Sequence, residues 1–181
     1  VLCDAITWAE QRYEPVTLVD VATLTLTGPH GVAIPCAIGR SGACPADEKR
    51  EGDGKTPLGR WPIRTILFRR GAAVPPLGLR LPWRWIGPDD GWSDGVEDPE
   101  YNRPVRHPHA HSAERLVRED GAYDVIVVLG HNDAPPVPGR GSAIFLHCSE
   151  GRPTAGCVAV EKPALLALLP TLQPGDAVEI A

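Results

Sequence analysis

Proline and glycine together fill more than a fifth of this chain, and no other feature limits its fold as much. Of its 181 residues, 20 are proline and 19 are glycine. Proline lacks a backbone N–H donor and glycine loses the most conformational freedom on folding, so both are poor residues inside helices and central strands. The composition therefore predicts a loop-rich, strand-dominated domain.

The remaining composition excludes several classes of protein. With 43% hydrophobic and 23% charged residues, the chain can bury one core and is not disordered. No apolar run approaches the roughly 18 residues of a membrane span, and a net charge of -5 argues against general nucleic-acid binding. We expect one domain over residues 1–181, in which residues 1–15 could form an N-terminal extension.

Hydrophobic periodicity predicts short strands and few helices. Residues 16–27 alternate leucine with threonine, which is typical of a half-buried strand, and a turn leads into a second strand over residues 32–38. Further strands are expected at residues 61–68, 81–86, 123–129, 144–147, 157–160 and 177–180, one helix at 163–169, and one or two helical turns at 112–118. Polar, glycine-rich residues 39–59 favour a long exposed loop. The predicted fold is mainly β, a sandwich or partly open barrel of mixed strands with one or two short helices.

The cysteine count is odd, which leaves at least one thiol unpaired within the chain in an oxidising compartment. The five cysteines are Cys3, Cys36, Cys44, Cys148 and Cys157. Cys36 and Cys44 are close enough in sequence to form a disulfide in an exported domain, and the sequence leaves open whether they do.

One histidine and one cysteine have the arrangement that thiol catalysis needs. His147 closes an apolar strand, and Cys157 begins another ten residues later, so the two can face each other across the connecting loop. A neighbouring imidazole stabilises the thiolate, which is the nucleophilic form. Gly156, directly before the cysteine, allows close approach of a substrate and lets nearby N–H groups point at a developing oxyanion. On spacing alone, both residues could instead be packing residues.

The residues around this pair resemble the L,D-transpeptidase catalytic domain, also called the YkuD-like domain. The resemblance rests on a strand-end histidine, a loop, and then Thr154-Ala155-Gly156-Cys157-Val158. It extends to further blocks in the same order at residues 37–42, 51–59, 101–105 and 139–144, and covers most of residues 32–165. Many members carry Ser-His-Gly-Cys at the nucleophile, whereas Thr154 and Ala155 stand here in place of the serine and the second histidine.

The resemblance implies roles for individual residues. Cys157 takes the position of the nucleophile, His147 that of the general base and acid, and the backbone carbonyl of Cys148 that of the group that orients the histidine ring. N–H groups around Gly156 would hold the oxyanion. Thr154, in the same motif, would contact substrate.

The implied reaction is a two-step acyl transfer on peptidoglycan stem peptides. A thioester on the cysteine is attacked by an amine of a neighbouring stem to form a cross-link, or by water, which gives L,D-carboxypeptidase activity. No metal or organic cofactor is implied, and β-lactams of the carbapenem class are expected inhibitors. Such an enzyme would work in the cell envelope, periplasmic or otherwise extracytoplasmic, although no export signal is visible in this chain.

Several other polar residues are candidates for substrate binding. Arg40 and Arg140 sit among glycines and could each bind a carboxylate through a bidentate contact, or brace a loop. His131 follows a buried strand and could line the same cleft or be a simple loop residue.

Two patterns that suggest metal sites fail on inspection. Six acidic residues lie within residues 89–100, but Trp92 and Tyr101 occupy positions where a calcium loop needs oxygen ligands. His107, His109 and His111 alternate, but Pro108 interrupts them and no matching ligands follow, so a surface loop is favoured.

A non-catalytic cell-wall binding module is the alternative from a different class. It would use Trp83, Trp85 and Trp92 as a platform for stacking sugars, although core packing is an equally ordinary use of tryptophan. This alternative predicts that Cys157 is unreactive.

Overall fold

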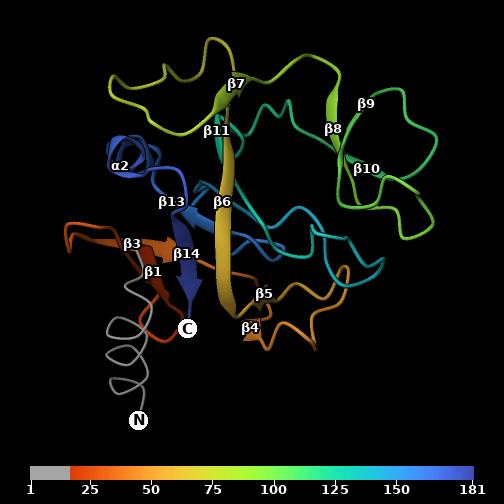
Figure 1. Cartoon of the computed structure of the whole chain (residues 1–181), viewed down its shortest axis with the longest axis horizontal. Helices are drawn as coiled ribbons and strands as arrows, with labels where there is room; N and C mark the ends of the chain where they lie inside the picture. The colour runs from red at the N-terminus through yellow and green to blue at the C-terminus, as the bar shows by residue number, and fades with distance from the viewer. Residues whose placement is uncertain (1–16) are drawn as a thin grey trace.

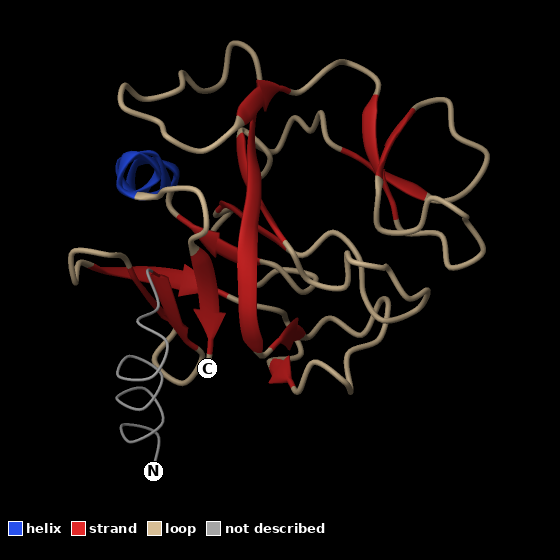
Figure 2. Ribbon diagram, in the orientation of Figure 1, coloured by secondary structure: helices blue, strands red, loops and turns tan. Residues whose placement is uncertain are grey.

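The computed structural model describes residues 17–181 and is mainly β, as predicted (Figures 1 and 2). Its strands are β1 (Thr17–Asp20), β2 (Thr25–Thr27), β3 (Ala33–Ala37), β4 (Ala43–Cys44), β5 (Thr56–Pro57), β6 (Gly59–Phe68), β7 (Trp83–Trp85), β8 (Asp90–Ser93), β9 (Pro104–Arg106), β10 (Ala113–Arg115), β11 (Val125–Leu129), β12 (Phe145–Cys148), β13 (Val158–Val160) and β14 (Ala177–Ile180). The helix α2 (Lys162–Leu168) continues into a 3₁₀ turn, Leu169–Thr171. Residues 1–15, named above as an N-terminal extension, and Cys3 lie outside the described residues.

The main sheet closes on itself through its longest strand. Its order is β11-β12-β13-β3-β2-β1-β14-β6-β7, and β6 also pairs with β11. The first half of β6 pairs with β14 and the second half with β11, so β6 closes the sheet onto its first strand (Figure 1). β7 pairs with the end of β6 as an additional strand. Parallel pairs, β1 with β14 and β12 with β13, lie among antiparallel ones. The result is a barrel-like sheet of mixed strands.

Side chains on β12 and β13 alternate between two apolar clusters. Leu146 and Cys148 join the main core, together with Val158 and Val160. Phe145 and Cys157 belong to the second cluster on the opposite face. Successive side chains on a strand point to opposite faces. Every second side chain of β12 and β13 therefore packs in the main core, and those between them lie on the outer face of the barrel. The helix α2 packs on the main core through two buried leucines, Leu165 and Leu168.

A small second sheet corrects one prediction. Residues 112–118 were expected to form helical turns, but β10 pairs antiparallel with β8, and β8 also pairs with β9. In this register Glu114 lies opposite Trp92. A capping serine and a helical propensity are weak local signals, and cross-strand pairing overrides them here.

The strand predicted over residues 16–27 is two strands joined by a turn. The Asp20 carboxylate accepts hydrogen bonds from the N–H groups of Ala22, at 2.9 Å, and Thr23, at 3.3 Å. This local capping turns the chain back, so that Val19 pairs with Leu26. The predicted hairpin with residues 32–38 is present as the antiparallel pair of β2 and β3.

The prediction of an exposed loop over residues 39–59 is correct for several polar residues, such as Arg40, Asp47 and Arg50, but wrong for others that are buried. Lys49 is only 2% exposed and Thr56 is fully buried. The Thr56 hydroxyl accepts a hydrogen bond from the Gly39 N–H at 2.8 Å and donates one to the Cys157 carbonyl at 3.3 Å. This segment therefore packs against the turn that carries Cys157.

Within residues 17–181, no helix has the length and apolar character that a membrane span requires.

Candidate active site

A pocket of about 500 Å³ opens on the outer face of β12 and β13. Both His147 and Cys157 line it, and each is 7% exposed. Charged side chains surround them, from the loop before β5, from β10 and from the segment that leads into β11. They include Arg40, Lys49 and Glu51 before β5, Glu114 on β10 and Arg118 before β11, and Asp94 after β8 joins them.

The strand register puts the histidine and the cysteine on one face. β12 and β13 are parallel, with Leu146 beside Val158 and His147 beside Ala159. Cys157 comes directly before β13 and lies beside Phe145, whose N–H is 3.4 Å from the Cys157 sulfur. His147 is two residues further along the neighbouring strand, so the two Cα atoms are about 8 Å apart and both side chains point into the pocket.

A backbone contact fixes the ring of His147. Its Nδ1 lies 2.8 Å from the carbonyl oxygen of Cys148, so Nδ1 carries the hydrogen and Nε2 keeps the lone pair. The edge-on ring of Tyr123 packs against it, with ring centroids 5.3 Å apart. Burial lowers the pKa of His147 to about 4, so the imidazole is neutral at neutral pH.

The thiol of Cys157 is neutral in the same range. Its sulfur lies 3.1 Å from the carbonyl oxygen of Ala143, to which the S–H donates. Burial raises the pKa of this thiol to about 12, although the cations Lys49 and Arg118 act in the opposite direction. The resting site therefore holds a neutral thiol and a neutral imidazole.

A buried asparagine holds the carbonyl that faces the thiol. Ala143 has a left-handed backbone conformation, with φ of 51°, and its N–H donates to Asn102 Oδ1 at 3.0 Å. The Asn102 amide also accepts from the Trp92 indole at 2.9 Å and donates to the carbonyls of His131, at 3.1 Å, and Asn132, at 2.7 Å. All four hydrogen-bonding positions of the amide are thus filled. The only indication in the sequence that Asn102 matters is its place in residues 101–105, one of the blocks that resemble the L,D-transpeptidase domain.

The turn before Cys157 is held by Thr154. Its hydroxyl donates to the Cys157 carbonyl at 2.7 Å and accepts from the Gly156 N–H at 3.1 Å. The Gly156 N–H, predicted to hold the oxyanion, is thus used within the turn in this structure, and its role in the reaction stays a prediction. The N–H groups of Ala155 and Cys157 have no such partner in the described part of the chain. Gly156 itself has φ of 148°, and a Cβ there would lie 3.0 Å from the Lys55 carbonyl oxygen, which explains the glycine.

The sequence of this chain matches a model of a known protein family. The sequence model of the YkuD family, described as the L,D-transpeptidase catalytic domain, matches residues 16–180. The chain belongs to this family. Comparisons with curated proteins and with solved structures gave no match. The chain is accordingly an L,D-transpeptidase, an enzyme of a family that acts on peptidoglycan, and the non-catalytic alternative is set aside.

The substrate residues predicted for this L,D-transpeptidase fall into two groups. Arg40 and Thr154 line the pocket, and the exposed Arg40 guanidinium has no ion-pair partner among the described residues. Arg140 and His131 lie outside the pocket lining. The Arg140 side chain donates to the Asp47 carbonyl, and its own carbonyl oxygen lies 3.0 Å from His131 Nε2. These contacts fit the alternative that Arg140 braces a loop, and the predicted substrate roles of Arg140 and His131 stay predictions.

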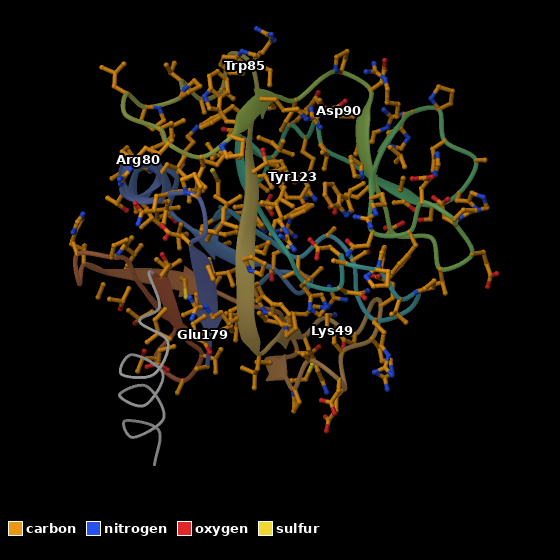
Figure 3. The ribbon with its side chains drawn as sticks, in the orientation of Figure 1. Lys49, Arg80, Trp85, Asp90, Tyr123 and Glu179 are labelled. Atoms are coloured by element: carbon orange, nitrogen blue, oxygen red, sulfur yellow. The ribbon has the colours of Figure 1, made fainter. Side chains whose placement is uncertain are left out.

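Sequence reasoning missed a charged group on one wall of the pocket. The Arg118 guanidinium lies 3.0 Å from Glu114 and 4.9 Å from the centre of the Tyr123 ring. Burial raises the pKa of the Glu114 carboxyl, while Tyr123 and Arg118 lower it. Figure 3 shows Tyr123 at the centre of the molecule, among the strands that carry the site. No motif recognised in the sequence marks these residues, although they lie within ten residues of one another.

Lys49 is a second residue that sequence reasoning missed. Its ammonium group is 2.5 Å from Asp53 and 2.9 Å from the Arg50 carbonyl oxygen. Lys49 was missed because residues 39–59 were predicted to be an exposed loop. It lines the pocket near Gly156. A buried lysine needs such partners, because an unpaired buried charge is costly.

The patterns that suggested metal sites serve to hold one loop together. His109 Nε2 lies 2.6 Å from the Asp98 carboxylate, which also accepts from the Ser93 hydroxyl at 2.5 Å. Residues 17–181 contain no group of three or more histidine, cysteine, aspartate or glutamate side chains placed to hold a metal ion.

The cysteines other than Cys157 are free thiols where the structure describes them. Cys36 on β3 and Cys44 on β4 are both free thiols in this structure. Cys148 is buried in the main core, on the face opposite to His147, as the strand alternation predicted.

Proposed function

We propose that this L,D-transpeptidase transfers the acyl group of a peptidoglycan stem peptide through a thioester on Cys157. The donor is the carbonyl between an L-centre and a D-residue of a stem tetrapeptide. The observation that carries the proposal is that Cys157 and His147 project from neighbouring parallel strands into one pocket.

In the first step the sulfur attacks the donor carbonyl. Because His147 Nδ1 is engaged by the Cys148 carbonyl, Nε2 is the atom that takes the proton from the thiol as the S–C bond forms. The thiol leaves the Ala143 carbonyl by rotation about its Cα–Cβ bond. The N–H groups of Ala155 and Cys157 stabilise the oxyanion, whereas the Gly156 N–H is used within the turn.

In the second step the tetrahedral intermediate collapses. The C–N bond breaks, and His147 Nε2 gives its proton to the departing D-alanine amine. An amine of a neighbouring stem then attacks the thioester carbonyl, and the amine gives a proton to Nε2 as the new C–N bond forms. The C–S bond breaks, the proton passes from Nε2 to the departing sulfur, and a cross-link is formed. Water in place of the amine would give a shortened stem, the L,D-carboxypeptidase reaction.

We also assign supporting roles to Arg40, which would bind the substrate, and to Thr154, which holds the turn before Cys157. Arg40 lines the pocket with no ion-pair partner among the described residues, and we assign it to a substrate carboxylate. Thr154 fixes the direction of the nucleophile through its two hydrogen bonds. Because the proposed substrate lies outside the cytoplasmic membrane, we assign the enzyme to the periplasm or an equivalent space. The family match supports one catalytic domain over residues 16–180.

A carbapenem tests the assignment of the nucleophile, because its strained amide acylates an activated thiol. Intact mass spectrometry should find one adduct on the wild type and none on Cys157→Ala. Cys36→Ala, which removes a half-buried free thiol on β3, is the matched control and should keep the adduct. A wild-type level of adduct in Cys157→Ala would overturn the proposal.

A stem tetrapeptide distinguishes the two outcomes of the thioester. Incubation with the tetrapeptide alone should release D-alanine, and mass analysis of the peptides should show a dimer. If only the shortened tripeptide appears, hydrolysis is the reaction of this enzyme.

A further inference from the structure

We infer that the loop between β6 and β7, residues 69–82, together with the adjoining Trp83 of β7, docks this enzyme on an anionic phospholipid surface. The loop extends beside β7 and α2, at the upper left of Figure 1. None of its residues lines the catalytic pocket. The surface is therefore separate from the active site and independent of the reaction proposed above.

Charge is distributed unevenly around this loop. The whole chain has a net charge of -5, yet residues 54–88 contain no aspartate or glutamate. The cationic residues of this range are Lys55, Arg60, Arg64, Arg69, Arg70, Arg80 and Arg84. An acidic protein thus has one segment that carries positive charge only.

Two arginines of the loop keep their charge without an acidic partner among the described residues. Arg69 is paired with Asp124 at 2.7 Å, and Arg84 with Asp90. In contrast, the Arg70 guanidinium lies over the Trp85 ring, 4.8 Å from its centre. Arg80 donates only to neutral oxygens, of Thr171 at 3.2 Å and of Pro170 and Gln173 at 3.4 Å. Figure 3 shows Arg80 and Trp85 toward the same end of the molecule.

The tip of the loop exposes large apolar side chains. Val74 is 80% exposed, Leu77 is 96% exposed and Trp83 is 42% exposed. The base of the loop is anchored, because Ala73 and Leu81 are buried in the main core. Two prolines separate Val74 from Leu77 and stiffen the tip. The apolar side chains are thus held outward by a rigid, anchored loop.

Apolar tips beside uncompensated arginines fit the chemistry of a lipid interface. Val74 and Leu77 can enter the boundary of the acyl chains, while Arg70 and Arg80 stay with the phosphate groups and Trp83 lies at the level of the headgroups. A soluble polyanion would pair with the arginines but leave Val74 and Leu77 in water. The combination therefore favours a bilayer that contains anionic lipid.

Cosedimentation with vesicles tests the inference on the full chain. Vesicles of phosphatidylcholine containing about one quarter phosphatidylglycerol should bind the protein, and vesicles of phosphatidylcholine alone should not. The double variant Arg70→Gln/Arg80→Gln should weaken binding about 25-fold, since each charge contributes about fivefold. Arg70→Lys/Arg80→Lys keeps the charge and should bind within about twofold of the wild type.

The apolar contribution is tested with Val74→Ser/Leu77→Ser, which should weaken binding about tenfold or more. Val32→Ser and Arg115→Gln change exposed residues elsewhere and should bind as the wild type does. Cys157→Ala should also bind normally, which separates this inference from the reaction. Absence of vesicle binding, equal binding to neutral vesicles, or equal losses in the control variants would overturn it. Loop-dependent binding to purified peptidoglycan but not to vesicles would also overturn it.

Discussion

The thiol of Cys157 donates its hydrogen bond to the carbonyl oxygen of Ala143, at 3.1 Å. In the described chain no hydrogen bond joins this thiol to His147. The carbonyl is held in place because the Ala143 N–H is bound by the buried side chain of Asn102. The resting nucleophile is thus stored in its protonated form, and substrate binding has to bring sulfur and imidazole together.

The first prediction concerns the pH dependence of thiol reactivity in the free enzyme. With the pKa of Cys157 near 12 and that of His147 near 4, no thiolate–imidazolium pair exists at neutral pH. The rate of alkylation by iodoacetamide should rise roughly tenfold per pH unit from about pH 6 to about pH 10, because only the thiolate reacts. Intact mass measured against time gives the rate, with Cys157→Ala as the background for the other thiols. A plateau near pH 7 would instead mean that the dyad is an ion pair at rest.

A second prediction distinguishes the effect of the Thr154 hydroxyl from the effect of the size of its side chain. Thr154→Val keeps the shape but loses the bonds to the Gly156 N–H and the Cys157 carbonyl. We expect it to lower the free energy of unfolding by about 1–3 kcal/mol and to slow carbapenem acylation at least about tenfold. Thr154→Ser keeps the hydroxyl and should retain most of both. Equal acylation rates for the valine and serine variants would show that the hydroxyl does not position the nucleophile.

The third prediction addresses Asn102. Asn102→Ala leaves the Ala143 N–H and two carbonyls without partners and should cost about 3 kcal/mol of stability in urea unfolding. Because the Ala143 carbonyl is then no longer fixed against the thiol, alkylation of Cys157 at a fixed pH should become about fivefold faster. Asn132→Ala, which removes an asparagine that binds Val137 and Gly141, is the matched control. It should lower stability without changing the alkylation rate, and the same rate in both variants would contradict the prediction.

The fourth prediction links His147 to acid stability. Burial lowers the folded-state pKa of His147 to about 4 from 6.5, so below about pH 6.5 the unfolded chain binds the proton more readily than the folded one. Stability from the neutral imidazole is complete above about pH 6.5 and is lost as the pH falls toward 4, by about 2 kcal/mol at about pH 5. Urea unfolding of wild type and His147→Gln at about pH 7.5 and pH 5 measures this. The variant should lose less stability than the wild type between these pH values, and an equal loss would place the effect on other groups.

Local patterns sufficed for the parts of the fold that depend on neighbours in sequence. The apolar run at Val125–Leu129 forms β11, and the last strand, Ala177–Ile180, has the predicted bounds. Strand alternation also predicted that Cys148 points away from His147, whereas the shared face of His147 and Cys157 depends on the register between β12 and β13. The helix after the nucleophile also lies within a residue or two of its prediction.

Three contacts decided what the sequence could not show, one between separate strands and two within a few residues of the chain. Residues 112–118 have helical signals, yet β8 pairs with them and makes a strand. The sequence predicts that Lys49 lies in an exposed loop. Its side chain is instead buried at the pocket beside the nucleophile turn, where its ammonium group pairs with Asp53. Gly156 was expected to donate to an oxyanion, and the hydroxyl of Thr154 takes its N–H instead.

The sequence by itself determined the family, the mainly β fold and the pair of residues on which the proposed chemistry rests, since short motifs and period-two alternation are local properties. Only the tertiary structure decided the protonation state of that pair and the direction of the thiol. Both depend on burial and on partners such as Asn102, which is 41 residues from Ala143 in the chain. Desolvation and hydrogen bonds across such separations exist only after the barrel has closed.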